Sequence, residues 1–226
     1  MQILLIGCEY AGTTTVANGI VGWAEESMGA FRGIPDEYRI HDHFKIPHIS
    51  HLPEFTEEEY RQILALSPRV KEMVQRHNVF YHLPHQGWGN SVIMIGLYFD
   101  DNIYGPLYFN YLSNLAPDDP IMQTRSQFEN WLLKGAPDIV LVHVKASSDV
   151  IRQRMRQDPH LNAVLKDDDV EHVLSRFEEE FDSSAIPRKL VLDTGVATVD
   201  DTIYQFAEQI REYLNEDELA ALVANS

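Results

Sequence analysis

Short apolar runs alternate with amphipathic stretches along the whole chain. Residues 2–7, 91–99 and 138–144 are apolar runs without in-and-out alternation, which indicates strands that are buried on both faces. Weaker patterns predict further strands at residues 38–41 and 189–193. Strands that alternate with helices over the whole length predict an α/β fold, in which helices cover a parallel sheet.

Apolar residues at helical spacing predict helices between these strands. The first helix is expected to begin near Thr13, a capping box at residues 56–59 opens the second, and Pro68 starts the third. Further helices are expected at residues 123–134, 148–157, 170–181 and from Thr198 onward, and the acidic tail from Asn215 is expected to be a frayed helix end. Because no linker or repeat is visible, we expect residues 1–226 to form a single domain.

Charge and cysteine content narrow the possible partners. The chain has 18 Lys and Arg against 35 Asp and Glu, a formal net charge of −17 at pH 7. This balance repels a phosphate backbone, so nucleic acid is not an expected partner. Cys8 is the only cysteine, which suits a reducing compartment. With no signal peptide or membrane span in the pattern, we expect a cytoplasmic protein that binds small molecules and no membrane.

The segment from Gly7 to Thr15 stands where a phosphate-binding loop must stand, between the first strand and the first helix. Glycines at both ends let backbone N–H groups point inward, and the helix N-terminus adds its positive end. A hydroxyl one residue into the helix, that of Thr14, is suited to ligate Mg²⁺. The residues expected to bind nucleotide phosphates are Gly7, Tyr10, Ala11, Gly12, Thr13, Thr14 and Thr15.

The loop departs from the pattern G-x-x-x-x-G-K-[ST], because Thr13 replaces the lysine. That lysine normally neutralises the β- and γ-phosphates. Lys145, after the third apolar run, and Lys45 are candidate replacements, although each could equally be a solvated surface lysine. The remaining alternative is a plain strand–turn–helix corner whose glycines serve only the backbone.

With these features the chain resembles the P-loop nucleoside and nucleotide kinases, in the neighbourhood of thymidylate kinase and deoxynucleoside kinase. The loop, Asp100-Asp101 after the second apolar run, and residues 138–152 and 192–202 carry the resemblance. It implies a three-layer P-loop fold, with a five-stranded parallel sheet in the order 2-3-1-4-5 flanked by helices. It also implies a lid-like region at about residues 146–185. The implied activity is Mg²⁺-dependent transfer of the γ-phosphoryl group of ATP to a small acceptor such as a nucleoside or nucleotide.

The resemblance also assigns roles to acidic residues by position. Asp100 or Asp101 would hold Mg²⁺ or act as a base toward the acceptor hydroxyl. Asp42, after the weak second strand, would lie at the acceptor site.

Basic residues of the lid-like region receive roles in the same way. Arg152 and Arg156, one turn apart on one helix face, would close over the transferring phosphoryl group. Arg154 would point away from that face, and Arg176 is a further lid candidate. The alternative is a solvated helix whose arginines form only surface salt bridges.

Two other readings stay open. Ala11-Gly12-Thr13-Thr14 is also similar to the phosphosulfate loop of sulfotransferases, although Tyr10 stands where that family has its lysine. A nucleotide-binding protein that has lost catalysis together with the lysine is the third possibility. A metal site among His41, His43, His48 and His51 is less favoured than a loop with exposed histidines, because the spacing fits no regular ligand pattern.

Overall fold

The computed structural model describes residues 1–29, 39–42, 56–81, 83, 91–111, 122–160 and 163–225. Within them, five parallel strands form one sheet in the order β2-β3-β1-β4-β5. The strands are β1 (Gln2–Ile6), β2 (Arg39–Asp42), β3 (Val92–Ile95), β4 (Val140–Lys145) and β5 (Arg188–Asp193). β1 is central and pairs with β3 on one side and β4 on the other. Its carboxyl end, where the phosphate loop begins, therefore lies in the middle of one sheet edge.

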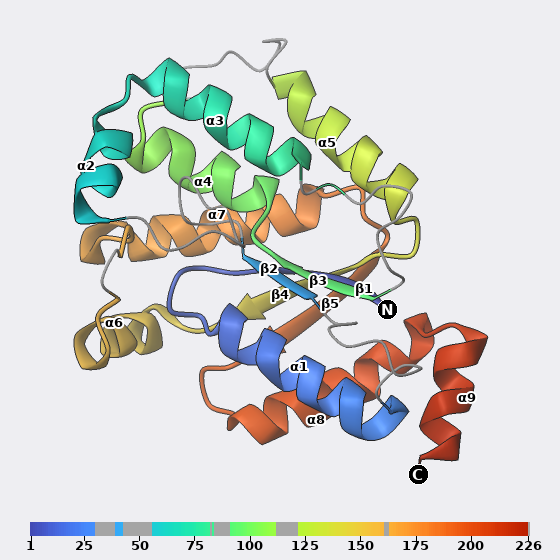
Figure 1. Ribbon diagram of the computed structural model, residues 1–226. Helices are drawn as coiled ribbons and strands as arrows, with labels where there is room; N and C mark the ends of the chain where they lie inside the picture. The colour runs from blue at the N-terminus through green and yellow to red at the C-terminus, as the bar shows by residue number, and fades with distance from the viewer. Residues whose placement is uncertain are drawn as a thin grey trace.

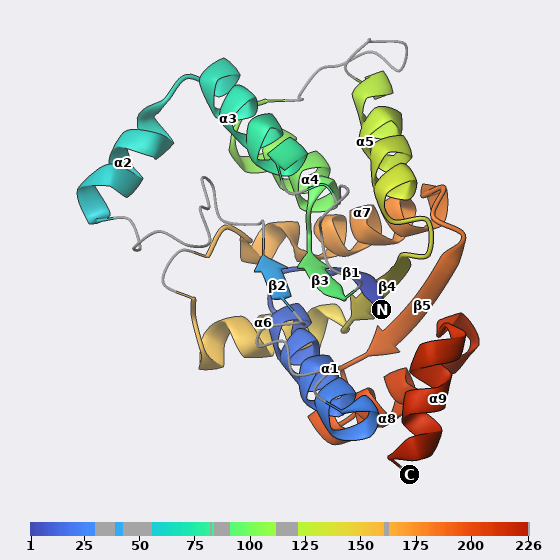
Figure 2. The ribbon, with the colours of Figure 1, turned by 45° about the vertical axis from the view of Figure 1, so that its right-hand side comes forward.

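Helices cover both faces of this sheet. α1, α8 and α9 lie on one side, and α3, α4, α5 and α7 lie on the other (Figures 1 and 2). The helices are α1 (Thr13–Met28), α2 (Glu57–Ala65), α3 (Pro68–Tyr81), α4 (Tyr98–Tyr108), α5 (Met122–Gly135), α6 (Ser148–Gln157), α7 (Val170–Ser183), α8 (Val199–Ile210) and α9 (Glu216–Ala224), with single 3₁₀ turns η2 (Asp167–Asp169) and η3 (Arg211–Tyr213). The expected α/β fold with a parallel sheet flanked by helices is confirmed.

Burial along the strands follows their place in the sheet. β1, β3 and β4 are buried over nearly their whole length, whereas residues of β5 alternate between buried and exposed. This difference is expected because β5 is an edge strand, and the central strands have helices on both faces. Among the described residues, no helix combines the length and the apolar character that crossing a bilayer requires.

The pattern predicts one strand over the second apolar run, residues 91–99. The structure shows a shorter strand followed by the start of a helix. β3 ends at Ile95, and Gly96 and Leu97 then take positive φ values of 74° and 51°. The chain turns there into α4, so Asp100 and Asp101 lie in the first helical turn and do not follow the strand directly. Apolar continuity hid the boundary, because Tyr98 and Phe99 are as buried in the helix as they would be in a strand. Acidic side chains in a first turn are stabilised by the helix dipole.

The acidic tail is also ordered, in contrast to the expected frayed end. Asn215 caps α9 in a capping box with Glu218, and α9 packs against α1. Glu218 is buried and accepts a hydrogen bond from the ammonium group of Met1. Helix α9 therefore closes the core beside the start of β1.

Candidate functional site

The loop between β1 and α1 is built from backbone conformations that curl the chain. Tyr10 and Gly12 have φ values of 69° and 95°, and the N–H of Ala11 donates to the Cys8 carbonyl at 2.8 Å. A Cβ on Gly7 would lie 2.5 Å from the Val144 carbonyl oxygen, so only glycine fits where the loop crosses the end of β4. A left-handed conformation costs free energy at a tyrosine, and such strain concentrates at functional sites.

The start of α1 lacks a side-chain cap. Its N-cap residue is Gly12, which has no side chain to accept from the first-turn N–H groups. Val16 is the first residue whose N–H returns to the cap, at 2.9 Å from the Gly12 carbonyl. Thr56, Ser147, Thr198 and Asn215 cap α2, α6, α8 and α9 with their side chains, whereas α4 and α7 also begin without a side-chain cap. The N–H groups of the first turn of α1, together with the exposed Thr14 hydroxyl, therefore suit an anion.

An arginine lies behind the loop. Arg154 on α6 donates from Nη1 to the carbonyl oxygens of Tyr10 and Ala11, at 2.9 and 3.2 Å. The same side chain donates to the hydroxyl and the carbonyl of Thr194, at 3.1 and 2.7 Å. The spacing along α6 predicts that Arg154 points away from the face of Arg152 and Arg156, and the direction in which it points is the one that meets the loop. Burial lowers the pKa of its guanidinium, and the Asp193 carboxylate opposes that shift; an arginine nevertheless keeps its charge.

Thr194, just after β5, links the loop to the ends of two strands. Its hydroxyl donates to the Ala11 carbonyl at 2.7 Å, and its N–H donates to the Lys145 carbonyl at 2.8 Å. The Ala11 carbonyl thus accepts from both Arg154 and Thr194. These bonds fix the orientation of the peptide group between Ala11 and Gly12.

Two loop side chains reach into the segment between α6 and η2. Glu9 accepts from the N–H groups of Val164 and Leu165 at 3.1 and 2.9 Å, and it contacts the His160 ring at 3.2 Å. Tyr10 stacks on the His160 ring with centroids 4.1 Å apart, and its hydroxyl accepts from the His160 N–H. The part of the chain expected to form a lid is therefore anchored on the loop itself.

Asp100 lies on the loop side of α4. Its carboxylate contacts the Gly96 backbone so closely that a Cβ there would be 2.0 Å from Asp100 Oδ2. Burial raises the pKa of Cys8 and of Tyr104, and the charge of Asp100 adds to both shifts. The Tyr104 hydroxyl accepts from the Glu9 N–H at 2.9 Å. Asp100, Tyr104 and the loop thus form one contiguous region.

Asp101 lies beside α3. Its carboxylate accepts from the Tyr111 hydroxyl at 2.6 Å. Burial raises the pKa of Asp101 from 3.8 to about 6, although the bond from Tyr111 and the charge of Arg76 lower it. Asp100, Asp101, Gln75, Tyr104 and Tyr111 line one space that leaves no room for a water molecule. The two adjacent aspartates therefore share part of their surroundings, and it is the charge of Asp100 that acts on Cys8 of the phosphate loop.

Of the remaining lysine and aspartate candidates, Lys145 and Asp42 lie at the carboxyl ends of strands. Lys145 ends β4, and its ammonium group pairs with Glu178 of α7. Asp42 ends β2 in register with Ile95, at the same sheet edge as the loop. Lys45 lies outside the described residues, as do His43, His48 and His51. Within the described part of the chain, no three His, Cys, Asp or Glu residues gather as a metal-binding group.

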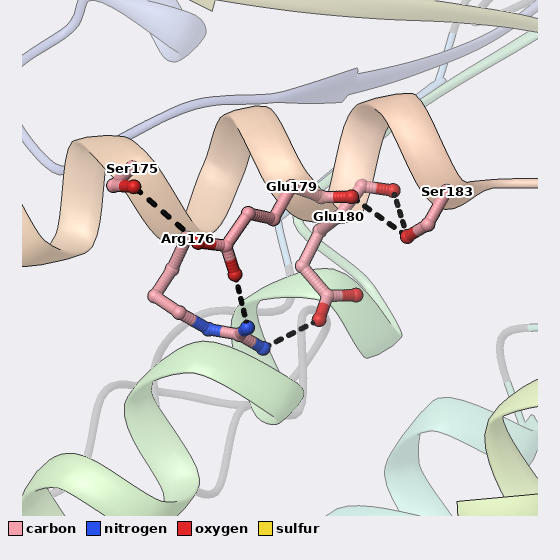
Figure 3. Close-up of polar contacts among 5 residues, drawn as sticks. All are labelled: Ser175, Arg176, Glu179, Glu180 and Ser183. Carbon is pink, nitrogen blue, oxygen red and sulfur yellow. Dashed lines mark hydrogen bonds and ion pairs between the residues drawn. The ribbon is translucent and has the colours of Figure 1, made fainter.

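The predicted lid arginines have different partners. Arg152 forms two hydrogen bonds with Glu171 of α7, at 2.5 and 2.6 Å, and Arg156 is exposed. Arg176 pairs with Glu179 and with the buried Glu180 on its own helix (Figure 3). Their roles toward a phosphoryl group stay predictions, and in this structure Arg154 is the lid-region arginine that contacts the loop.

Sequence reasoning missed Arg154, Glu9 and Thr194 as site residues. Spacing along α6 separates Arg154 from Arg152 and Arg156, but it does not tell which face of the helix meets the loop. Arg154 and Thr194 lie 40 residues apart, and no local pattern links them. The one available signal is the position of Thr194 at the carboxyl end of a strand, where ligand sites of open α/β sheets gather.

Comparison with known proteins supports the fold. No family model matches the sequence, and no curated protein is significantly similar to it. A deoxyadenosine kinase from M. mycoides, solved with bound dATP, is similar with a TM-score of 0.57 and 16% identity, over 93% of this chain and 99% of that chain. A thymidylate kinase from Candida albicans is similar with a TM-score of 0.55 and 16% identity, over 96% and 93%.

By name, both structural neighbours are kinases of nucleosides or nucleotides. At 16% identity the likeness concerns the fold, not the reaction or the substrate. Both likenesses span more than nine tenths of this chain. The chain therefore has the fold of the P-loop nucleoside and nucleotide kinases.

Proposed function

We propose that this protein is an ATP-dependent kinase that phosphorylates a nucleoside, a nucleotide or a similar small acceptor. The observation that carries the proposal is the uncapped start of α1 behind a curled glycine-bounded loop. In the fold of nucleoside and nucleotide kinases, this loop is placed at the carboxyl ends of the central strands, where ligands bind. Its backbone N–H groups suit the phosphates of a nucleotide.

The donor set near the loop fits Mg²⁺. The Thr14 hydroxyl is exposed at the helix start, and the Asp100 carboxylate lies in the region next to the loop. Mg²⁺ prefers oxygen ligands and usually binds one or two carboxylates with substrate phosphates and water. When bound, Mg²⁺ neutralises charge that develops on the β- and γ-phosphates. We propose Thr14 and Asp100 as its protein ligands, with Asp100 acting directly or through water.

The acceptor would lie at the edge formed by the ends of β2 and β3. Asp42 ends β2 in register with Ile95, and we propose that it contributes to the acceptor site, with Asp100 or Asp101 as the candidate base toward the acceptor hydroxyl. Arg152 would approach the transferring phosphoryl group once its ion pair with Glu171 opens. Arg156, which is exposed, would approach the same group. Catalysis would then depend on positioning and charge neutralisation, without a covalent intermediate. The acidic chain supports small-molecule partners in place of nucleic acid, and the single cysteine is compatible with a cytoplasmic protein.

The proposal is tested by binding first and turnover second. Melting temperatures are measured with ATP, GTP, ADP and 3′-phosphoadenosine 5′-phosphate, each with and without Mg²⁺. The protein is then incubated with ATP labelled at the γ-phosphoryl group and a panel of nucleosides, nucleotides and sugars. Mg²⁺-dependent stabilisation by ATP with label transfer supports a kinase. Stabilisation only by the 3′-phosphate nucleotide would contradict it in favour of sulfuryl transfer, and ATP binding without transfer to any acceptor would contradict the catalytic part.

A further inference from the structure

The missing lysine leaves the loop without a cation of its own, and Arg154 supplies a positive charge from the opposite side. Its guanidinium contacts the carbonyl oxygens of Tyr10 and Ala11. Nη1 lies 3.8 Å from the position of a Cβ on Gly12. Among the Lys and Arg side chains that the structure describes, Arg154 is the one that donates hydrogen bonds to the loop backbone.

The direction of these bonds matters for the concave side of the loop. All described peptide bonds are trans, so the C=O and N–H of one peptide group point in opposite directions. Because the Ala11 carbonyl points at Arg154, the N–H of Gly12 points away from the guanidinium. A bond from a charged donor to the carbonyl also polarises the peptide group, which makes its N–H a stronger donor. Arg154 thus orients and strengthens a donor that faces the expected phosphate position.

Two of the other candidate cations that the structure describes, Lys145 and Arg152, are engaged with carboxylates of α7. Lys145 pairs with Glu178, and Arg152 pairs with Glu171. Arg154 instead bonds to carbonyl oxygens and to the Thr194 hydroxyl. Among the described residues no carboxylate forms an ion pair with Arg154, although Asp193 lies near enough to affect its pKa. A half-buried cation in such surroundings is weakly screened and acts over several ångströms.

We infer that Arg154 takes the electrostatic place of the phosphate-loop lysine, acting from behind the loop through its peptide groups. This inference rests on the proposed function, since it concerns how the same loop binds a polyphosphate. Arg154 is a positioning residue in this account, because it acts on the nucleotide through the loop backbone. A loop with threonine at position 13 then needs no lysine in front of the phosphates.

Binding of inorganic tripolyphosphate tests the inference, because this probe has no base or sugar. Affinities are measured by calorimetry for the wild type, Arg154→Met, Arg154→Lys, Thr13→Lys and the double variant Thr13→Lys/Arg154→Met. We expect Arg154→Met to weaken binding about tenfold to a hundredfold, the range of a lost charged hydrogen bond. Arg154→Lys should stay much closer to the wild type. In the double variant the new lysine should restore most of the loss, although it cannot remake the bonds to the carbonyls.

Arg188→Met is the matched control. Arg188 pairs with Asp138 at the amino-terminal end of β5, so its removal takes away one charge far from the loop and should leave the affinity unchanged. Unfolding temperatures without ligand show whether each variant is folded. If Arg154→Met does not fold, the affinity of Thr13→Lys for tripolyphosphate still tests the inference. If Arg154 already supplies the missing charge, the added lysine should improve the affinity by less than about threefold.

Each failure has its own signature. Unchanged binding by Arg154→Met would overturn the inference and leave the proposed function standing. Weakened binding that Thr13→Lys does not restore would mean that Arg154 only holds the shape of the loop, which also overturns it. A gain of more than about threefold from Thr13→Lys alone would show that the charge was never replaced. A wild type that binds neither tripolyphosphate nor ATP would end both the inference and the proposed function.

Discussion

The carboxylate of Glu9 accepts a hydrogen bond of 2.9 Å from the N–H of Leu165, 156 residues further along the chain. Glu9 belongs to the phosphate loop, and Leu165 belongs to the segment before η2 that is expected to form part of a lid. The neighbouring N–H of Val164 donates to the same oxygen. Because the Glu9 side chain is almost fully buried, this contact couples the shape of the loop to the position of that segment.

Replacement of Glu9 by alanine should release this segment. The N–H groups of Val164 and Leu165 lose their acceptor, and we expect a loss of about 1–3 kcal/mol in the free energy of unfolding. Hydrogen exchange at these two amides should become faster, which mass spectrometry of the corresponding peptide can measure. Glu25→Ala on the exposed side of α1 is the matched control. Equal exchange in Glu9→Ala and the wild type would contradict the coupling.

Two glycines near each other in sequence should respond in opposite ways to alanine. At Gly7 a Cβ would lie 2.5 Å from the Val144 carbonyl, so Gly7→Ala should destabilise the protein by about 1–3 kcal/mol. At Gly22, inside α1, a Cβ meets no atom within 4 Å. Gly22→Ala should therefore stabilise by about 0.5–1 kcal/mol, because alanine is the better helix former. Urea unfolding measures both, and a tolerated Gly7→Ala would mean that the loop crossing is not tight.

Thr14 should matter for the metal-dependent part of nucleotide binding. Thr14→Ala removes the hydroxyl proposed to ligate Mg²⁺, whereas Thr14→Ser keeps it. We expect the alanine variant to bind ATP with little response to added Mg²⁺, and the serine variant to respond like the wild type. Calorimetric titrations with and without Mg²⁺ make the comparison. A normal Mg²⁺ response in Thr14→Ala would remove this residue from the metal site.

His143 and Asp101 should give stability opposite dependences on pH. Burial lowers the pKa of His143 from 6.5 to about 4. As pH falls through this window the unfolded chain gains a proton that the folded chain does not, so the free energy of unfolding falls. Burial raises the pKa of Asp101 from 3.8 to about 6. Between these two pKa values the folded chain keeps a proton on Asp101 that the unfolded chain has lost, so the free energy of unfolding falls as pH rises.

Single variants separate the two effects. His143→Leu should become more stable relative to the wild type as pH falls from 7 to 4, by up to about 3 kcal/mol. Asp101→Asn should show the reverse trend over the same range. Urea unfolding at several pH values measures both differences. A pH-independent difference for His143→Leu would show that this side chain titrates normally in the folded protein.

The helices and the buried strands could be predicted because local signals agree with the fold. The capping box at Thr56 is formed as its spacing predicts, Thr198 caps α8 where a helix is expected to begin, and the predicted helix at residues 148–157 is confirmed as α6. The apolar pattern did not predict the boundary between a strand and a helix where both are equally buried. The run after Ser91 contains the end of a strand and the start of a helix, and only the positive φ values of Gly96 and Leu97 separate them.

The site was harder to predict, because its contacts join distant segments. The loop itself was visible from its glycines and its place in the chain. The contacts of Glu9 with Val164 and of Arg154 with Tyr10 span 155 and 144 residues, and they depend on how helices and loops meet at the sheet edge. Apolar periodicity says which face of a helix is buried, but it does not say which loop lies opposite a polar side chain on that helix.

The central claim is that the loop between β1 and α1 binds the phosphates of a nucleotide. Its most direct test is a calorimetric titration of the wild type with ATP in the presence of Mg²⁺, repeated after saturation with tripolyphosphate. The account predicts one saturable site for ATP that tripolyphosphate blocks. Absence of ATP binding, or ATP binding that tripolyphosphate leaves untouched, would contradict it.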